Sequence, residues 1–170
     1  DARVYDTGMI CIIEIMGRHA GWLTAASKLA GMCGYGPDLI YLPELPFDMD
    51  SFLDKVEKIY KENNYCIVAV SEGLHYADGT FVSEASTSAT DGFGHAQLGG
   101  LAAKLAHVVG ERTGAKVRGV ELSLLQRCGA HLASKTDIEE SYMSGSEAVK
   151  NAVAGVTDKM VGFECKREGG

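Results

Sequence analysis

The sequence lacks the patterns that mark several classes of protein. Its five cysteines are odd in number and contain no CxxC pair, which argues against a zinc site and a disulfide framework and favours a reduced, cytoplasmic setting. Its apolar runs fall well short of the roughly 20 residues that cross a membrane. With three prolines and no low-complexity tract, a disordered chain is not expected. The sequence therefore indicates a globular protein that does not act at a membrane.

Basic residues are scarce as well. The sequence holds 16 Lys and Arg against 23 Asp and Glu, a net charge of −7 at neutral pH, so it offers no general attraction to nucleic acid. A bound anion would need a few focused basic side chains. The 170 residues, 46% of them hydrophobic, suffice for one domain with a buried core. Because the first residue is not Met and Arg167 to Gly170 read as a cut end, we expect residues 1–170 to be a single domain from a longer chain.

Apolar runs alternate with helical segments along the chain. The β-branched run from Met9 to Ile15 is typical of a strand buried on both faces, and further strands are expected at 39–42, 65–70, 116–125 and 160–165. Composition and periodicity predict helices at 22–29, 51–61, 96–112 and 137–154. Asp48 or Asp50 would cap the second of these helices, and Ser134 or Asp137 would cap the last.

This alternation predicts a three-layer α/β fold, in which a mostly parallel sheet has helices on both faces. Trp22, in the first helix, is expected in the core. The stretch at 72–95 is rich in Gly, Ser and Thr and is expected to be a long loop, and loops of that length are usually functional or disordered.

Candidate binding residues follow the apolar runs, because ligands of open parallel sheets bind beyond the carboxyl ends of the strands. Those positions hold Met16-Gly17-Arg18, Glu44, Ser71-Glu72-Gly73 and Gln126-Arg127. Two of these strand ends carry Arg and two carry Glu, in a chain that is otherwise acidic. That combination suits a phosphorylated polyol.

Arg18 is the first candidate, because its planar guanidinium can make bidentate hydrogen bonds to phosphate and Gly17 lets the backbone approach a ligand. Glu72 could accept hydrogen bonds from sugar hydroxyls. Arg118 and Arg127 could supply two cations to an anion site, at opposite ends of one strand or together with a second chain. The alternative for each Arg is a structural salt bridge, and for Glu72 it is a loop or cap acid.

Other chemistries find little support. The five histidines show no metal-ligand spacing, and His95 fits a loop residue that holds backbone. The serines near residue 86 lack the GxSxG pattern of hydrolases, and no Walker A motif is present.

Four segments together resemble the phosphofructokinase family in content, order and spacing: IIEIMGRHAGWLTAASKLA (12–30), LIYLPELPFD (39–48), CIVAVSEGL (66–74) and LSLLQRCGAHLASKTD (122–137). The likeness covers nearly the whole chain, and it implies a phosphofructokinase-like fold for the α/β sheet. The stretch DGFGHAQLGG (91–100) is similar to the insertion of pyrophosphate-dependent and mixed-donor members.

The resemblance implies roles for individual residues. Arg18 would be catalytic and, with Met16 and Gly17, part of the fructose 6-phosphate site, while Glu72 would bind the sugar hydroxyls. Arg127 would hold the 6-phosphate within one subunit.

The resemblance also implies roles for the residues around Arg127 and for a second subunit. Leu124 and Gln126 belong to the same substrate-binding stretch as Arg127, although Leu124 stands where the family has His. Arg118 would reach the site of a neighbouring subunit, which implies a homo-oligomer with shared sites. Met9 stands where the family has a second cross-subunit Arg.

Two motifs of the phosphofructokinase family are missing from residues 1–170. The glycine-rich donor loop and the catalytic aspartate motif are absent, so the donor (pyrophosphate or ATP) and the ligands of Mg2+ would belong to another part of the longer chain. We expect the longer protein to phosphorylate the 1-hydroxyl of fructose 6-phosphate in glycolysis, and the isolated piece to be inactive. The alternatives are a non-catalytic sugar-phosphate-binding regulatory subunit and an α/β domain without a ligand.

Overall fold

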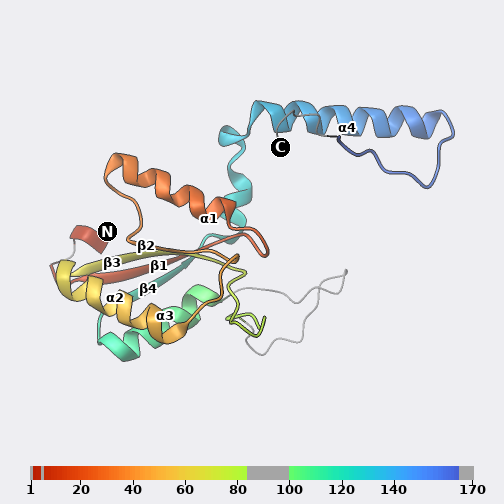
Figure 1. The fold of residues 1–170 in the computed structure, drawn as a ribbon. Coiled ribbons are helices and arrows are strands. Elements are labelled where there is room, and N and C mark those ends of the chain that lie inside the picture. Colours follow the sequence, from red (N-terminus) through yellow and green to blue (C-terminus); the bar gives the residue numbers. More distant parts are fainter. Residues whose placement is uncertain (1, 5, 84–99, 165–170) are drawn as a thin grey trace. The chain divides into compact units, whose positions relative to one another are not determined.

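The computed structural model describes residues 2–4, 6–83 and 100–164, and the chain divides into two units, residues 1–126 and 127–170. The described part of the first unit contains a four-stranded sheet and three α-helices (Figure 1). Its principal elements are β1 (Met9–Ile15), α1 (Trp22–Ala26), β2 (Leu39–Tyr41), α2 (Met49–Asn63), β3 (Tyr65–Ser71), α3 (Leu101–Thr113) and β4 (Val117–Glu121). Whether residues 1–170 form one domain stays a prediction.

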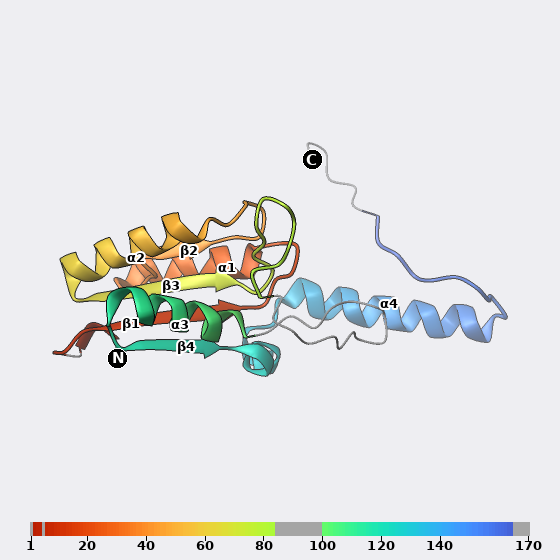
Figure 2. The same cartoon turned by 90° about the horizontal axis from the view of Figure 1, so that it is seen from below.

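The sheet has the strand order β2-β3-β1-β4, and each neighbouring pair is parallel. The chain runs from the central β1 to the edge strand β2, and then returns across the sheet through β3 to β4. Right-handed crossovers in opposite directions place their helices on opposite faces of a sheet. Accordingly α1 covers one face, and α2 and α3 cover the other (Figures 1 and 2). The predicted fold class is confirmed.

Local sequence signals account for α2. The backbone N–H of Ser51 donates to Asp48 Oδ1 at 2.7 Å, so Asp48 is the N-cap. Phe52 and Val56, four residues apart, lie on the same face of the helix and are fully buried. The helix ends where Asn64 adopts a left-handed conformation with φ 62°.

The main hydrophobic core lies between the sheet and helices α2 and α3. Ile10 and Ile12 of β1 point to this side, because alternate residues of a strand share a face. The other buried members of the core come from the helices, from β3 and from the loops that follow β2 and β3: Phe47, Phe52, Leu53, Val56, Cys66, Val68, Val70, Leu74, Val82, Leu101, Ala102, Leu105 and Val109.

Glu14 is an acidic residue in this otherwise apolar layer. It follows Ile10 and Ile12 on the same face of β1, and it is only 3% exposed. Its Oε2 accepts a hydrogen bond of 2.8 Å from the N–H of Ala102, in the first turn of α3. Burial raises the pKa of this carboxyl, and the nearby charges of Glu121 and Glu72 add to the rise. Glu14 thus joins the central strand to α3 at an electrostatic cost.

Three sequence-based expectations are wrong in this unit. The strand expected at 116–125 ends at Glu121, which pairs with Glu14 near the end of β1, and a 3-10 helix (Ser123–Cys128) follows. Trp22 is 83% exposed, because Thr24 is the α1 residue that points inward. The helix expected at 22–29 is an α-helix only as far as Ala26, and a 3-10 helix (Ser27–Cys33) continues it to Gly34.

The second unit contains α4 (Lys135–Val153), which begins where the N–H of Asp137 donates to Ser134 Oγ at 3.3 Å. Among its described residues, 127–164, none has a buried side chain. The strand expected at 160–165 is not formed over 160–164, which adopt no regular structure, and residue 165 lies outside the described part. No other described segment of this unit is a strand, so residues 160–164 find no strand partner within it for their backbone hydrogen bonds. In the described ranges of the whole chain, no helix has the length and apolar character needed to span a membrane.

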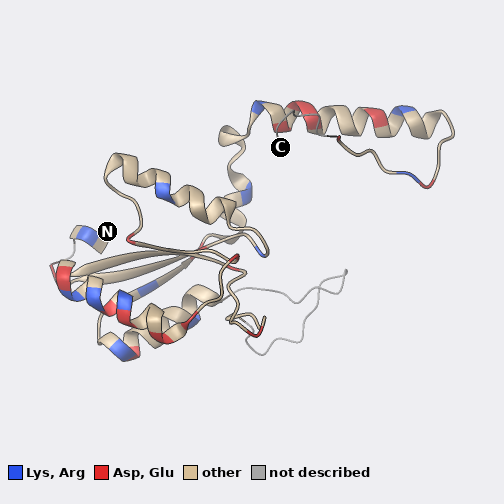
Figure 3. Ribbon diagram, in the orientation of Figure 1, with Lys and Arg blue, Asp and Glu red and all other residues tan. Residues whose placement is uncertain are grey.

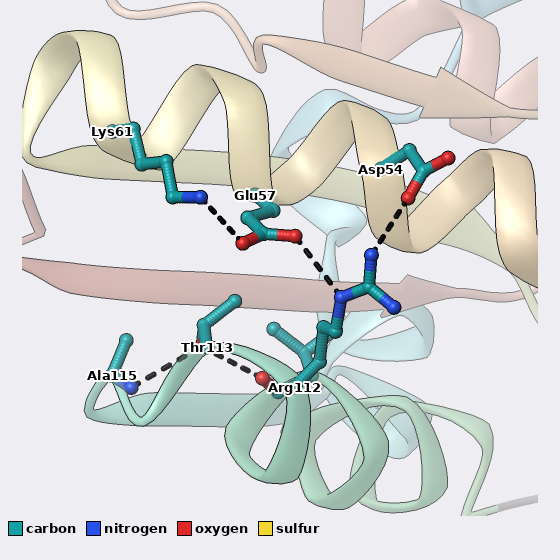
Figure 4. Close-up of polar contacts among 7 residues, drawn as sticks. Asp54, Glu57, Lys61, Arg112, Thr113 and Ala115 are labelled. Atoms are coloured by element: carbon teal, nitrogen blue, oxygen red, sulfur yellow. Dashed lines mark hydrogen bonds and ion pairs between the residues drawn. The ribbon is translucent and has the colours of Figure 1, made fainter.

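Helices α2 and α3 are also joined on their outer side (Figure 4). Arg112 contacts Glu57 through Nε and Asp54 through Nη2, each at 3.0 Å, and Glu57 contacts Lys61 at 2.6 Å. Hydrogen bonds from Lys61 and Arg112 lower the pKa of Glu57, and the bond from Lys61 has the larger effect. Beside this cluster, the Thr113 hydroxyl donates to the carbonyl of Val109 and accepts from the N–H of Ala115, which closes the end of α3.

Replacing Glu14 by Gln should change how stability depends on pH. The pKa of Glu14 in the folded state is raised above its ordinary value of 4.5, so this group favours folding at low pH, and its contribution is lost as the pH rises through the folded-state pKa. Gln can still accept from Ala102 but does not ionise. Urea unfolding at a series of pH values should therefore show the variant gaining on the wild type as the pH rises above about 4.5. Equal pH slopes for the two proteins would contradict this account, and Glu62→Gln on the exposed side of α2 is the control.

Replacing Arg112 by Met should give the opposite pH pattern. The pKa of Glu57 is lowered in the fold, so the ion pair stabilises the protein above the ordinary pKa of 4.5 and the contribution is lost as the pH falls through the folded-state value. The deficit in Tm of the variant should therefore shrink under acid conditions, and also in high salt. Lys58→Met, on the same helix as Glu57, provides the matched loss of charge. A deficit that is constant over pH and salt would show that packing, not charge, is lost.

Candidate functional site

The carboxyl ends of three strands meet at one edge of the sheet. In the register of the sheet, Ile15 of β1 is opposite Ser71 of β3, and Glu14 is opposite Glu121 of β4. The residues that follow these strands are therefore neighbours although they are far apart in the sequence. Figure 3 shows that charged residues gather mainly on helices and loops, and few lie along the strands. The predicted binding residues concentrate where the apolar strands end.

The turn after β1, residues 16–21, is held by side chains from three other segments. The N–H of Met16 donates to Gln126 Oε1 at 2.7 Å, and the N–H of Gly17 donates to Glu72 Oε1 at 3.2 Å. At the far end of the turn, the N–H of Gly21 donates to Glu44 Oε1 at 2.7 Å. The backbone of the turn is thus fixed by acceptors that follow β2, β3 and β4.

The centre of the turn lies against the end of β3. The Ser71 hydroxyl donates to the carbonyl of Gly17. Gly17 has a φ of 149°, a conformation that favours glycine. A Cβ on Gly73 would come within 1.8 Å of the Arg18 carbonyl oxygen, so only glycine permits this approach. Arg18, half-buried, is therefore carried by a backbone that packs directly on residues 71–73.

The structure brings together part of the predicted set. Met16, Gly17, Glu72 and Gln126 are in direct hydrogen-bond contact, and Arg18 lies on the same turn. Glu72 and Gln126 both accept hydrogen bonds from backbone N–H groups here. This contact agrees with the alternative of a loop acid for Glu72, whereas no structural contact is predicted for Gln126. Only one of the two oxygens of the Glu72 carboxylate is used in that contact.

Three further predicted residues are not among the side chains that hold the turn. Arg118 is an exposed residue of the edge strand β4, opposite Cys11, and therefore roughly 16 Å back along β1 from Met16 at about 3.3 Å per residue. Leu124 is 71% exposed on the 3-10 helix after β4. Arg127 is exposed and belongs to the second unit. Their contacts with a sugar phosphate stay predictions.

Two hydrogen bonds of acidic side chains near this site were not predicted from the sequence. The sequence marks Glu44 only as a residue that follows a strand. Its hydrogen bond to Gly21 depends on the tertiary placement of β2 beside β3. Glu14 looked like an ordinary strand residue, although an acid inside the apolar run MICIIEI is a signal for a buried, partnered carboxylate. Most of the predicted insertion at 91–100, including His95, lies outside the described residues.

The described residues contain no group of three His, Cys, Asp or Glu side chains that could hold a metal ion. The acids at the turn are already engaged as acceptors of backbone N–H groups. Across residues 2–4, 6–83 and 100–164, then, the side chains do not fit a Mg2+ site.

Comparison with known proteins agrees with the resemblance. The sequence profile described as Phosphofructokinase matches residues 4–151. The chain is 48% identical over 160 residues to a pyrophosphate–fructose 6-phosphate 1-phosphotransferase of Xanthomonas campestris pv. campestris, and 43% identical over 152 residues to one of Halomonas elongata. These alignments cover 91% and 89% of the chain but only 37% and 36% of the relatives. The chain thus spans little more than a third of their length.

A solved structure supports the same assignment. The crystal structure of a pyrophosphate-dependent phosphofructokinase from Marinobacter aquaeolei matches with a TM-score of 0.60 and 37% identity, over 86% of this chain and 32% of that one. The profile match takes in both the turn at 16–21 and most of α4. On this evidence the chain belongs to the phosphofructokinase family.

Proposed function

We propose that this chain is the fructose 6-phosphate-binding portion of a pyrophosphate-dependent phosphofructokinase. The observation that carries the proposal is the turn Met16-Gly17-Arg18, which lies at the carboxyl end of the central strand and is held by Glu72 and Gln126. The names of the relatives support pyrophosphate over ATP as the donor. Because the chain spans about 36% of the length of the first of these relatives, the complete activity would belong to a longer protein.

In the proposed reaction, the 1-hydroxyl oxygen of fructose 6-phosphate attacks a phosphorus of pyrophosphate, and phosphate leaves. The guanidinium of Arg18 would stabilise negative charge on the phosphoryl group during transfer, since positioning and electrostatics dominate this chemistry. Glu72 would accept a hydrogen bond from a sugar hydroxyl with the oxygen that Gly17 does not use. Met16 and Gly17 would line the sugar with backbone, whose position Gln126 controls.

Two further arginines would bind the 6-phosphate of the sugar. Arg127 would bind this phosphate in its own subunit, and Arg118 would do so in a neighbouring subunit of a homo-oligomer, for which its exposed place on an edge strand is suitable. Donor and Mg2+ would be bound outside residues 1–170. Cys11, Cys33, Cys66 and Cys128 are free thiols, which supports a reducing, cytoplasmic setting for a glycolytic enzyme.

Arg18→Ala in the full-length protein should lower kcat by about 100-fold or more, because the loss of one charged donor from a transition state has that order of effect. The measurement is formation of fructose 1,6-bisphosphate from fructose 6-phosphate and pyrophosphate. Arg112→Met, which removes the same charge on α3, should leave kcat unchanged. A wild-type kcat in Arg18→Ala would exclude the proposed role. A full-length wild type that binds fructose 6-phosphate but forms no product would favour the regulatory subunit.

Arg127→Ala should raise the KM for fructose 6-phosphate by about tenfold, since a charge-assisted contact with phosphate contributes roughly 1.5–3 kcal/mol. The KM for pyrophosphate should change much less, because the contact is with the acceptor. Steady-state kinetics with each substrate varied in turn separates the two effects. An unchanged KM for fructose 6-phosphate would rule out Arg127 as the anchor of the 6-phosphate.

A further inference from the structure

Glu44 makes a side-chain contact with the backbone at the far end of the turn. It follows Pro43, three residues after the end of β2, and its Oε1 accepts the 2.7 Å hydrogen bond from the N–H of Gly21. Among the described residues, this is the only hydrogen bond of the Glu44 side chain, and no ion pair is found for it there. A backbone N–H bound to a carboxylate is a charge-assisted pair, which is stronger than a neutral hydrogen bond.

The backbone at Gly21 fits closely against the segment that carries Glu44. A Cβ on Gly21 would lie 2.8 Å from Glu44 Oε2, 2.8 Å from Pro43 Cδ and 2.9 Å from Leu42 Cδ2. Gly21 and Pro43 are both buried. The hydrogen bond therefore sits at a tight junction between the end of the turn and the loop after β2, and a shorter side chain at position 44 would leave the N–H of Gly21 without this acceptor.

Arg18 lies between the two fixed ends of the turn. On its amino-terminal side, Glu72 and Gln126 hold Gly17 and Met16, and on its carboxyl-terminal side the next side-chain contact to the backbone is that of Glu44 with Gly21. His19 and Ala20, which connect Arg18 to Gly21, are exposed. Among the described residues, Glu44 thus supplies a side-chain tie to the carboxyl-terminal end of the turn.

We propose that Glu44 is a positioning residue for Arg18: through its hydrogen bond to Gly21 it fixes the backbone that directs the Arg18 guanidinium toward the reacting phosphoryl group. This inference rests on the proposed function. Glu44 does not touch the substrate, and its effect on the reaction passes through the turn. Small displacements of a charged group away from a reacting centre reduce the rate steeply, so loss of the tie should lower the rate as well as the stability of the fold.

The test uses the full-length protein and three substitutions. Glu44→Ala removes the acceptor and should lower kcat/KM for fructose 6-phosphate by about tenfold, mainly through kcat. Glu44→Gln keeps an oxygen that can accept from Gly21 and should recover most of the loss. Glu62→Ala removes an exposed carboxylate from α2 and serves as the matched control, with unchanged kinetics. Tm values of all variants show whether they fold.

The decisive measurement is a double-mutant cycle with Arg18→Ala. If Glu44 acts through Arg18, Glu44→Ala should cost less than about twofold once Arg18 is gone, because coupled residues are not additive. An equal loss in both backgrounds would overturn the positioning role while the role of Arg18 stands. A Glu44→Gln variant that folds but is as impaired as Glu44→Ala would also overturn it. A wild-type kcat in Arg18→Ala alone would instead reject the proposed function, and this inference with it.

Discussion

The pairing of β1 on both sides determines what can reach the turn that follows it. Because β3 and β4 run parallel to β1, with Ile15 opposite Ser71 and Glu14 opposite Glu121, the chain leaves all three strands at the same edge. Antiparallel neighbours would have brought one amino end and one carboxyl end together. The apolar strands make this arrangement possible, since a parallel sheet must be covered on both faces.

The acids near this edge have different tasks and different environments. Glu14 is buried beneath α3, where burial raises its pKa, whereas Glu44 and Glu72 accept from backbone N–H groups at the rim. Arg18 therefore stands on a turn surrounded by carboxylates that are largely engaged with amides. A carboxylate that already accepts from an amide competes less with phosphate for a guanidinium, which is what the proposed role of Arg18 in an acidic chain requires.

The sequence predicted those parts of the fold that depend on neighbouring residues alone, such as strand composition and helix caps. The buried run of β1, the Asp48 cap of α2 and the Ser134 cap of α4 follow from residue type and spacing. Expectations failed where the outcome depends on distant partners. Leu122 to Leu125 resemble a strand, but β1 ends at Ile15 and offers no further partner. Trp22 suits a core by composition, yet the orientation of α1 on the sheet leaves it in solvent.

The same limit applies to the candidate site. The residues of the turn could be selected from the sequence because strand ends and Arg-Gly pairs are visible there. The side chains that hold the turn could not be selected in the same way. The sequence left Glu72 open between a sugar ligand and a loop acid, the resemblance implied a substrate-binding role for Gln126, and Glu44 was marked only as a strand-end residue. Their contacts with Met16, Gly17 and Gly21 arise only from the strand order.

The three ties of the turn differ greatly in the length of chain that each one closes. Gly21 and Glu44 are 23 residues apart, Gly17 and Glu72 are 55 apart, and Met16 and Gln126 are 110 apart. Contacts of large sequence separation form late, since the loop-closure entropy must be overcome first. During synthesis the turn would emerge before β3 and β4 but acquire its final geometry only after β4 has joined the sheet. A half-folded chain would thus display Arg18 without the geometry to use it.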